Sequence, residues 1–294
     1  MKIFKKALGS PSASKDNNTP NPSSKHPLSQ PPIPPNNYGH FPPTFSIYFS
    51  GPSDDKETAY FVLGLESESE NKNNDQITPL NAIAFYKRTA KHQLTLLAGP
   101  QHDTSPVLAL AGIERFSGST HLIALPGQES GSGSGGGVVN RFVRLKYGGG
   151  DYFKYCFELE VGHGHGQHTE SFEWRTGNTR PQENKPFKRW LVRLGNNPDS
   201  DSRDREEEVI GTWVKEQDMS TAKQTTAKMG TFSFQGSGAT GDLGPYCTLA
   251  IVVSLLRINQ ADWMAAVAAD IESVSPGKVA LGVGSFSVTS AGLV

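Results

Sequence analysis

Cysteine is nearly absent from this sequence of 294 residues, which contains only Cys156 and Cys247. Two cysteines are too few for a framework of disulfides, and their scarcity is typical of proteins in a reducing compartment. We therefore expect a cytoplasmic protein. Cys156 falls in a strand-like run and Cys247 in an apolar segment, so we predict that both are small buried side chains.

An excess of charge of one sign is also lacking. The formal net charge is −1 and the isoelectric point is about 6.7. A nearly neutral chain has no overall positive field to attract a nucleic acid, so we do not expect a nucleic acid as a partner.

Long apolar runs are missing too. The longest one, from Leu249 to Leu256, ends at Arg257, far short of the roughly 20 residues that a membrane span needs. We expect no transmembrane segment.

The common catalytic motifs are missing as well. No GxSxG, Walker A or HExxH pattern occurs, and no spacing groups the Ser, His and Asp residues into a catalytic arrangement. We therefore predict that the protein is not an enzyme and that it binds no cofactor.

One glycine pattern resembles a nucleotide-binding turn. Gly236, Gly238 and Gly241 spell GxGxxG between an expected strand and an expected helix, as in dinucleotide-binding proteins. Too few residues follow this pattern for a doubly wound fold, and the segments before it are consecutive strands. A tight turn into a buried helix requires the same glycines, and we favour that interpretation.

A histidine-rich segment resembles a metal site. His163, His165 and His168 are close enough in sequence to share a transition metal. No cysteine, aspartate or second histidine cluster completes the ligand set, and the flanking glycines leave the three side chains unorganised. We interpret the segment as a polar hairpin loop and expect no metal.

The N-terminal 43 residues differ in composition from the rest. They contain 10 of the 20 prolines, with serine and asparagine between them, and too little apolar surface to offset the entropy cost of folding. We predict a disordered arm over 1–43, a folded domain over 44–268 and a C-terminal tail over 269–294. The polyproline run Pro31–Pro35 suits a spacer, which we favour, or a ligand for SH3 or WW domains.

The folded domain has the pattern of an all-β protein. Short runs rich in Val, Ile, Phe, Tyr and Thr alternate with clusters of Gly, Pro, Asn and Asp, at the spacing expected of a barrel or sandwich. The predicted strands are Thr44–Phe49, Tyr60–Leu65, Asn81–Arg88, Gln93–Ala98, Val107–Arg115, Thr120–Leu125, Val138–Arg144, Tyr152–Val161, Glu170–Arg175, Trp190–Leu194, Val209–Lys215 and Gly230–Gln235.

One helix is predicted after the last strand. Pro245 suits a first helical position, with Asp242 or Gly244 as a possible cap. From Cys247 to Ile258 apolar residues cover every side of the helix, so it must be enclosed by protein or by lipid. Because it is too short to span a membrane, we predict a closed antiparallel barrel of about twelve strands around this central hydrophobic helix.

Basic residues are concentrated in the second half of the predicted barrel, with Trp174 and Trp190 among them. Such side chains hold phosphates or anionic headgroups, or else they pair with Glu on a solvated sheet face. The candidate lipid-binding residues are Arg175, Arg180, Lys185, Lys188, Arg189 and Arg193.

Three stretches resemble one known family. Glu170–Arg175, Val209–Val214 and Phe232–Gly244, the last leading into the apolar helix, look like the tubby C-terminal-like domains of fungal proteins, which are related to the LURP-one and scramblase group. The resemblance covers about Thr44 to Gln260. It implies a twelve-stranded barrel around a central hydrophobic helix, and binding of phosphoinositide headgroups at membranes.

Two functions are therefore expected. The first is a non-enzymatic binding module for anionic phospholipid, phosphoinositide above all, on a cytoplasmic protein that attaches peripherally to membranes. The second is a scaffold for protein partners, in which the barrel is a structural core and the Pro-rich arm or the loops make the contacts.

Overall fold

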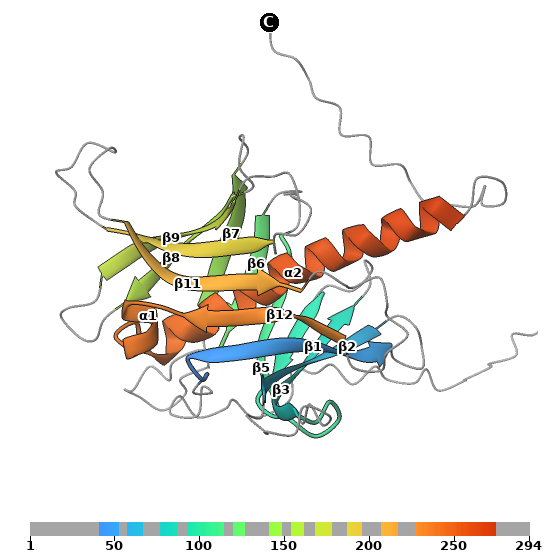
Figure 1. Cartoon of the computed structure of the whole chain (residues 1–294). Helices are drawn as coiled ribbons and strands as arrows, with labels where there is room; N and C mark the ends of the chain where they lie inside the picture. Colours follow the sequence, from blue (N-terminus) through green and yellow to red (C-terminus); the bar gives the residue numbers. More distant parts are fainter. Residues whose placement is uncertain are drawn as a thin grey trace, which may run out of the picture. The chain divides into compact units, whose positions relative to one another are not determined.

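Twelve antiparallel strands close into one barrel (Figure 1), as the sequence predicted. The computed structural model describes residues 41–52, 58–66, 77–86, 93–114, 120–126, 141–148, 154–161, 168–177, 187–195, 207–216 and 227–274. The strands are β1 (Thr44–Pro52), β2 (Thr58–Glu66), β3 (Ile77–Tyr86), β4 (Leu94–Leu97), β5 (Val107–Ile113), β6 (Thr120–Leu125), β7 (Arg141–Gly148), β8 (Lys154–Val161), β9 (His168–Thr176), β10 (Lys188–Leu194), β11 (Glu207–Lys215) and β12 (Ala227–Phe234). Each predicted strand overlaps one of these.

The barrel follows the order of the chain. Each strand pairs with its neighbours in sequence, and β1 closes the circle by pairing with both β2 and β12. At the closure Thr44 lies opposite Ser233, and Phe49 lies opposite Ala227. Because the sheet closes on itself, it leaves no unpaired edge that would recruit a strand from another molecule.

Side-chain alternation decides what faces the interior. In β9, Glu170, Phe172, Trp174 and Thr176 are buried, whereas the residues between them are partly exposed. This is the two-residue period of a strand with one wet face. Most inward residues are large and apolar, and together they form one continuous core with the central helix.

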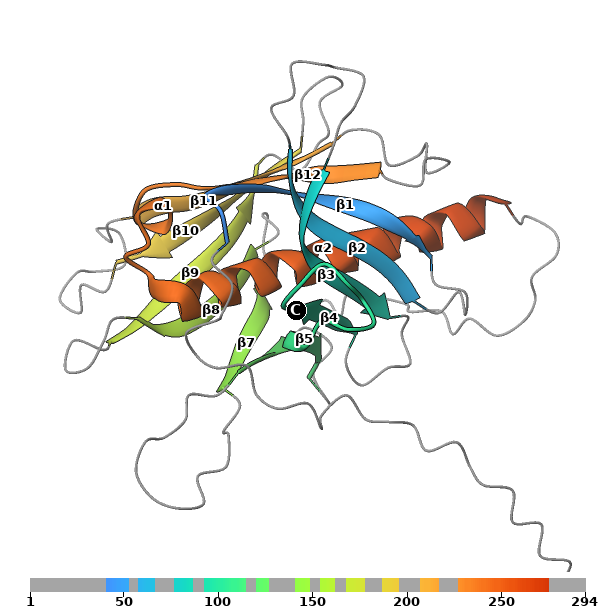
Figure 2. The ribbon, with the colours of Figure 1, turned by 90° about the horizontal axis from the view of Figure 1, so that it is seen from below.

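Two helices follow β12: the short α1 (Ser237–Thr240) and the long α2 (Gly244–Val274). Figure 2 shows α2 running through the middle of the barrel. Every residue from Leu249 to Gln260 is buried, so no face of the helix reaches solvent over this stretch. The central hydrophobic helix is therefore confirmed, and it continues past residue 268, where the tail was expected to begin. No helix in the described part of the chain is both long and apolar enough to cross a membrane.

Close packing joins the wall to the helix. The indole Nε1 of Trp174 donates a hydrogen bond of 2.8 Å to Ser254 Oγ of α2, and both side chains are buried. Trp263, farther along α2, packs edge-on against Phe61 with ring centroids 5.8 Å apart. Gly230 on β12 makes room for the ring of Trp213, because a Cβ there would collide with it.

The predictions for the cysteines and the arm have different outcomes. Cys247 is 1% exposed, as expected. Cys156 is only half-buried, because it lies on the outer face of β8, where its thiol approaches Glu173 Oε1 at 3.8 Å. The arm and the run Pro31–Pro35 lie outside the described residues except for 41–43, and Phe41 packs against the core. Residues 275–294 also lie outside them.

We predict that Ile251→Asp unfolds the barrel or destabilises it severely. Ile251 is 0% exposed inside the barrel. An unpaired carboxylate there costs on the order of 3–5 kcal/mol, a large part of a typical domain's stability. Chemical denaturation measures the loss. Val209→Asp is the control, because Val209 is 41% exposed on β11 and its change should cost no more than about 1 kcal/mol. Equal stabilities for the two variants would contradict the enclosed helix.

Candidate functional site

The four candidate basic residues that the structure describes do not lie on one face of the barrel. Arg180 and Lys185 lie outside the described residues, so their role in lipid binding stays a prediction. Lys188, at the start of β10, is exposed. The three arginines among the described candidates are each engaged with acidic side chains.

Strand alternation sends Arg189 and Arg193 towards the interior of the barrel. They lie opposite Thr176 and Phe172 of β9, both of which are buried. Arg189 lies near the end of the barrel where α2 leaves, which we call the Trp263 end. Arg193 lies near the other end, which we call the α1 end. Neither guanidinium belongs to an outer surface on which a membrane would rest.

Arg175 does lie on the outer face, but two carboxylates surround it. Its Nη1 and Nη2 atoms donate to the two carboxylate oxygens of Glu207 at 2.7 and 2.8 Å, and its Nε donates to Glu173 at 2.8 Å. The hydrogen bonds that Arg175 donates to Glu207 outweigh burial and raise the pKa of Arg175 above its ordinary value. A lipid phosphate would have to displace these carboxylates, so Arg175 offers little attraction to an anionic surface.

Arg189 is held in the same way inside the Trp263 end. It is 5% exposed, its Nη2 lies 2.8 Å from Asp262 Oδ2, and its Nη1 donates to Asn259 Oδ1 at 3.2 Å. Its guanidinium also covers the ring of Phe187, 4.8 Å from the centroid. The arginine therefore fixes α2 to the wall instead of facing a ligand.

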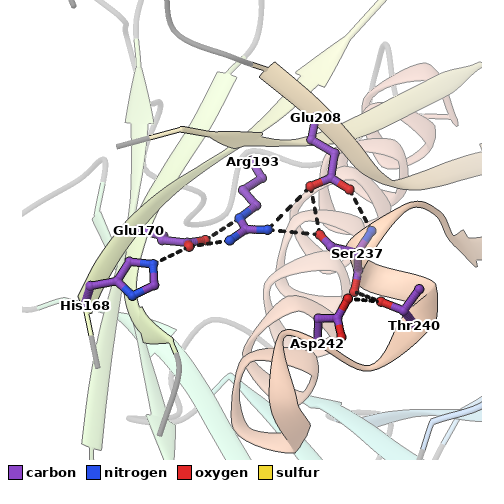
Figure 3. Close-up of polar contacts among 7 residues, drawn as sticks. All are labelled: His168, Glu170, Arg193, Glu208, Ser237, Thr240 and Asp242. Atoms are coloured by element: carbon purple, nitrogen blue, oxygen red, sulfur yellow. Dashed lines mark hydrogen bonds and ion pairs between the residues drawn. The ribbon is translucent and has the colours of Figure 1, made fainter. Parts of the chain in front are cut away.

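A polar network joins five side chains at the α1 end. It consists of His168, Glu170, Arg193, Glu208 and Ser237 (Figure 3). Both carboxylate oxygens of Glu170 accept from Arg193, and one of them lies 2.6 Å from His168 Nε2. Arg193 Nη1 reaches Glu208 at 3.5 Å and Ser237 Oγ at 3.2 Å. We call these five residues the α1 network.

The carboxylates of the α1 network are stabilised in their charged form. Burial raises the pKa of Glu170, but hydrogen bonds from Arg193 and His168 outweigh it, and the pKa lies below its ordinary value of 4.5. Glu208 behaves alike: burial raises its pKa, and the hydrogen bonds from Ser237 together with the charge of Arg193 lower it by more. Glu170 and Glu208 therefore stay ionised near pH 7, each in contact with the guanidinium of Arg193.

Glu208 also excludes a phosphate from the turn that resembles a nucleotide-binding loop. The backbone N–H of Ser237 donates to Glu208 Oε1 at 2.6 Å, and Ser237 Oγ donates to Glu208 Oε2 at 2.8 Å. The chain's own carboxylate thus occupies the position that a bound phosphate would take at this turn. Gly236 has a positive φ of 49°, and a Cβ there would collide with Glu208. These contacts explain the glycine without a nucleotide.

The histidine-rich segment shows no metal site in its described part. His163 and His165 lie outside the described residues, and His168 bonds to Glu170. No group of three metal-ligating side chains occurs in the segments that the structure describes.

An apolar groove of about 190 Å³ lies beside the α1 network. Phe41, Pro43 and Phe234 form one side, and Pro245 and Thr248 of α2 form another, with glycines of the α1 turn between them. Thr248 Oγ1 donates to the backbone of α2 itself. The groove therefore presents mostly carbon, which suits an apolar group and not a charged one.

The outer face of β7 joins two basic residues of the sequence, Arg144 and Lys146, to an aromatic ring that the sequence analysis did not single out. Phe142 is 59% exposed, the largest value among the large apolar residues that the structure describes. Arg144 and Lys146 follow at two-residue steps on the same outer face, while Val143 and Leu145 between them are buried. The feature of the sequence that could have revealed this surface is a phenylalanine at an outward position of a strand whose side chains alternate between interior and solvent.

The neighbouring strands extend this surface with apolar side chains. Ala124 of β6 lies opposite Phe142, Leu122 lies opposite Arg144, and Leu110 of β5 lies opposite Ala124. All three are partly exposed. Residues directly opposite in a sheet share a face. We call this surface of Phe142, Arg144, Lys146, Leu110, Leu122 and Ala124 the β7 face.

Comparisons with protein-family models, with curated proteins and with solved structures found no match to this chain. Its function is therefore argued from the geometry of its own residues.

We predict that Glu170→Gln destabilises the barrel in a pH-dependent way. The change removes the charge that two guanidinium nitrogens and His168 contact, which should cost about 1–3 kcal/mol at pH 7. Because folding lowers the pKa of Glu170, its contribution is fully present above the unfolded value of 4.5 and is lost as the pH falls through the folded pKa.

Chemical denaturation at pH 7 and below pH 4.5 tests this prediction. Glu160→Gln is the control, because Glu160 pairs with Arg141 at 3.3 Å while 55% exposed, and such pairs contribute less than about 1 kcal/mol. A loss for Glu170→Gln that equals the control, or that stays constant as the pH falls, would contradict the role given to the α1 network.

Proposed function

We propose that this chain is a non-enzymatic binding module that attaches peripherally to anionic phospholipid surfaces, including those that carry phosphoinositides. The observation that supports this proposal most is the β7 face. It combines the highly exposed aromatic ring of Phe142 with the cationic side chains of Arg144 and Lys146 on one outer wall. Apolar insertion next to positive charge is the combination that holds proteins at an anionic membrane interface.

The expected strength of attachment follows from these three side chains. Burying a phenylalanine contributes about 1.5–3 kcal/mol, and each basic residue near an anionic leaflet contributes about 1 kcal/mol. Arg144 contributes less than Lys146, because its Nε lies 3.0 Å from Glu114 Oε1, whereas Lys146 has no ion-pair partner among the described residues. The total corresponds to a dissociation constant on the order of 1 mM. Stable attachment would therefore need a second contact.

The β7 face suits this role better than the described arginines of the candidate basic stretch. Arg175 and Arg193 would have to break ion pairs with glutamates before they could meet a phosphate. Lys188 remains available as an exposed charge on β10, and Arg180 and Lys185, which lie outside the described residues, stay predicted lipid contacts. The second contact that stable attachment needs is assigned to these lysines and Arg180.

The proposal includes kinship with the tubby C-terminal-like domains. The closed barrel around an apolar helix supports it, because this is the fold that the resemblance implies. The three resembling stretches belong to neighbouring parts of the wall: Glu170–Arg175 lies in β9, Val209–Val214 in β11, and Phe232–Gly244 spans the end of β12, α1 and the start of α2.

A scaffold for protein partners is the second candidate. The apolar groove beside α1 favours it, because aromatic and proline side chains such as Phe41, Phe234 and Pro245 are typical of surfaces that take a partner's apolar side chain. In this function the barrel is the structural core, and the N-terminal arm or the loops add contacts.

We predict that the protein co-sediments with liposomes that contain phosphoinositide, and that Phe142→Ser and Lys146→Glu each weaken this binding. Loss of the ring should reduce the affinity about tenfold or more, and reversal of the lysine at least about fivefold. Binding should also fall as salt rises, because the charges are exposed and screened. Sedimentation at millimolar lipid, with and without anionic lipid, measures these effects.

Two variants serve as controls for this experiment. Val209→Ser changes an apolar side chain that is 41% exposed on β11, four strands away from β7, and should leave binding unchanged. Lys188→Glu examines the candidate basic stretch. If only Lys188→Glu weakens binding, the contact lies on that stretch and not on the β7 face. If the wild type does not bind at low salt, lipid binding is wrong and the scaffold function remains.

A further inference from the structure

A small cavity lies at the Trp263 end of the barrel, between α2 and the wall formed by β11 and β12. The volume that is open to the centre of a water molecule is about 10 Å³. The cavity is lined by Trp213, Lys215, Met229, Asn259, Asp262 and Trp263. A space of this size is enough for one water molecule.

Two of the residues that line this cavity carry a buried donor without an acceptor among the residues that the structure describes. The donors are the indole Nε1 of Trp213, whose residue is 1% exposed, and the amide Nδ2 of Asn259, whose residue is 3% exposed. The amide oxygen of Asn259 is already engaged, because it accepts from Arg189. The amide nitrogen of Asn259 therefore points away from Arg189. Buried donors in proteins are almost always paired, either with protein or with ordered water.

The cavity also has one strong acceptor in its wall. The carboxylate of Asp262 lines it while its Oδ2 atom lies 2.8 Å from Arg189 Nη2. A carboxylate has lone pairs beyond those that one guanidinium nitrogen uses. A group that accepts from Trp213 and Asn259 and donates to Asp262 would therefore satisfy every polar side of the cavity that these three residues form.

We propose that one ordered water molecule occupies this cavity, accepts hydrogen bonds from Trp213 Nε1 and Asn259 Nδ2, and donates one to the Asp262 carboxylate. Only a group with both donors and acceptors matches this set. A halide or another small anion would accept from the same two donors, and Lys215 would attract it. It would also lie against the negative charge of Asp262 without a proton to offer, so water fits better.

This water gives α2 a second indole attachment to the wall. In the middle of the barrel the indole of Trp174 on β9 bonds directly to Ser254 of the helix. At the Trp263 end the indole of Trp213 on β11 reaches Asn259 and Asp262 of the helix through the water. The direct bond of Trp174 therefore provides a matched internal control for the bridged bond of Trp213.

A crystal structure of the full chain at high resolution, with a second crystal soaked in bromide, tests the occupant. We expect electron density for one water oxygen at about 3 Å from both donor nitrogens, and no anomalous bromide signal there. A bromide peak in the cavity would show an anion site and overturn the proposal. An empty cavity, or side chains of Trp213 and Asn259 turned to protein acceptors, would overturn it as well.

Nuclear magnetic resonance gives an independent test in solution. With tryptophan-selective ¹⁵N labelling, the indole proton of Trp213 should show a nuclear Overhauser effect to a water of long residence, and that of Trp174 should show none. Trp213→Phe assigns the signal. Should that variant not fold, Trp174→Phe, Trp190→Phe and Trp263→Phe assign it by elimination. No water contact at Trp213, or equal contacts at both indoles, would contradict the proposal.

Discussion

Enclosure of α2 is the constraint on which the rest of this structure depends. The helix is buried on every side from Leu249 to Gln260, so its stability requires a wall that surrounds it completely. Barrels of about eight strands are filled by their own side chains, whereas larger ones enclose a lumen. A helix with its side chains measures about 10–12 Å across. A barrel of twelve strands therefore encloses a lumen that one apolar helix fills.

The two ends of the barrel hold the charges that this interior cannot accept. Arg193 meets Glu170 and Glu208 at the α1 end, where they fix the turn that leads into α2. At the Trp263 end Arg257 is 3% exposed and bonds only to neutral groups among the described residues, and burial lowers its pKa to about 10. Because the inward charges of the described residues are engaged inside, the function that we propose rests on the outer wall, where Phe142 is the most exposed of the large apolar residues that the structure describes.

The sequence was sufficient to predict the elements of the fold but not the partners of the charged side chains. Strands and the helix follow from local periodicity, which the sequence displays directly. Arg189 and Arg193 were grouped with Arg175 because they are near in sequence, yet strand alternation and pairing with distant residues place them inside. The bond between Glu208 and Ser237 connects the start of β11 to the turn after β12, and no local pattern in the sequence predicts it. Phe142 could be recognised as an outward side chain only after the structure showed which residues of β7 face the interior.

Hydrogen exchange of the backbone amides in α2 under native conditions tests the enclosed helix most directly. If the barrel closes around α2, the amides from Leu249 to Ile258 open only when the whole domain unfolds. Their free energy of exchange should then equal the global free energy of unfolding and match that of the inner residues of β9 and β11. Exchange of the α2 amides at a clearly lower free energy than these strands would mean that the helix leaves an intact wall, and it would contradict the account.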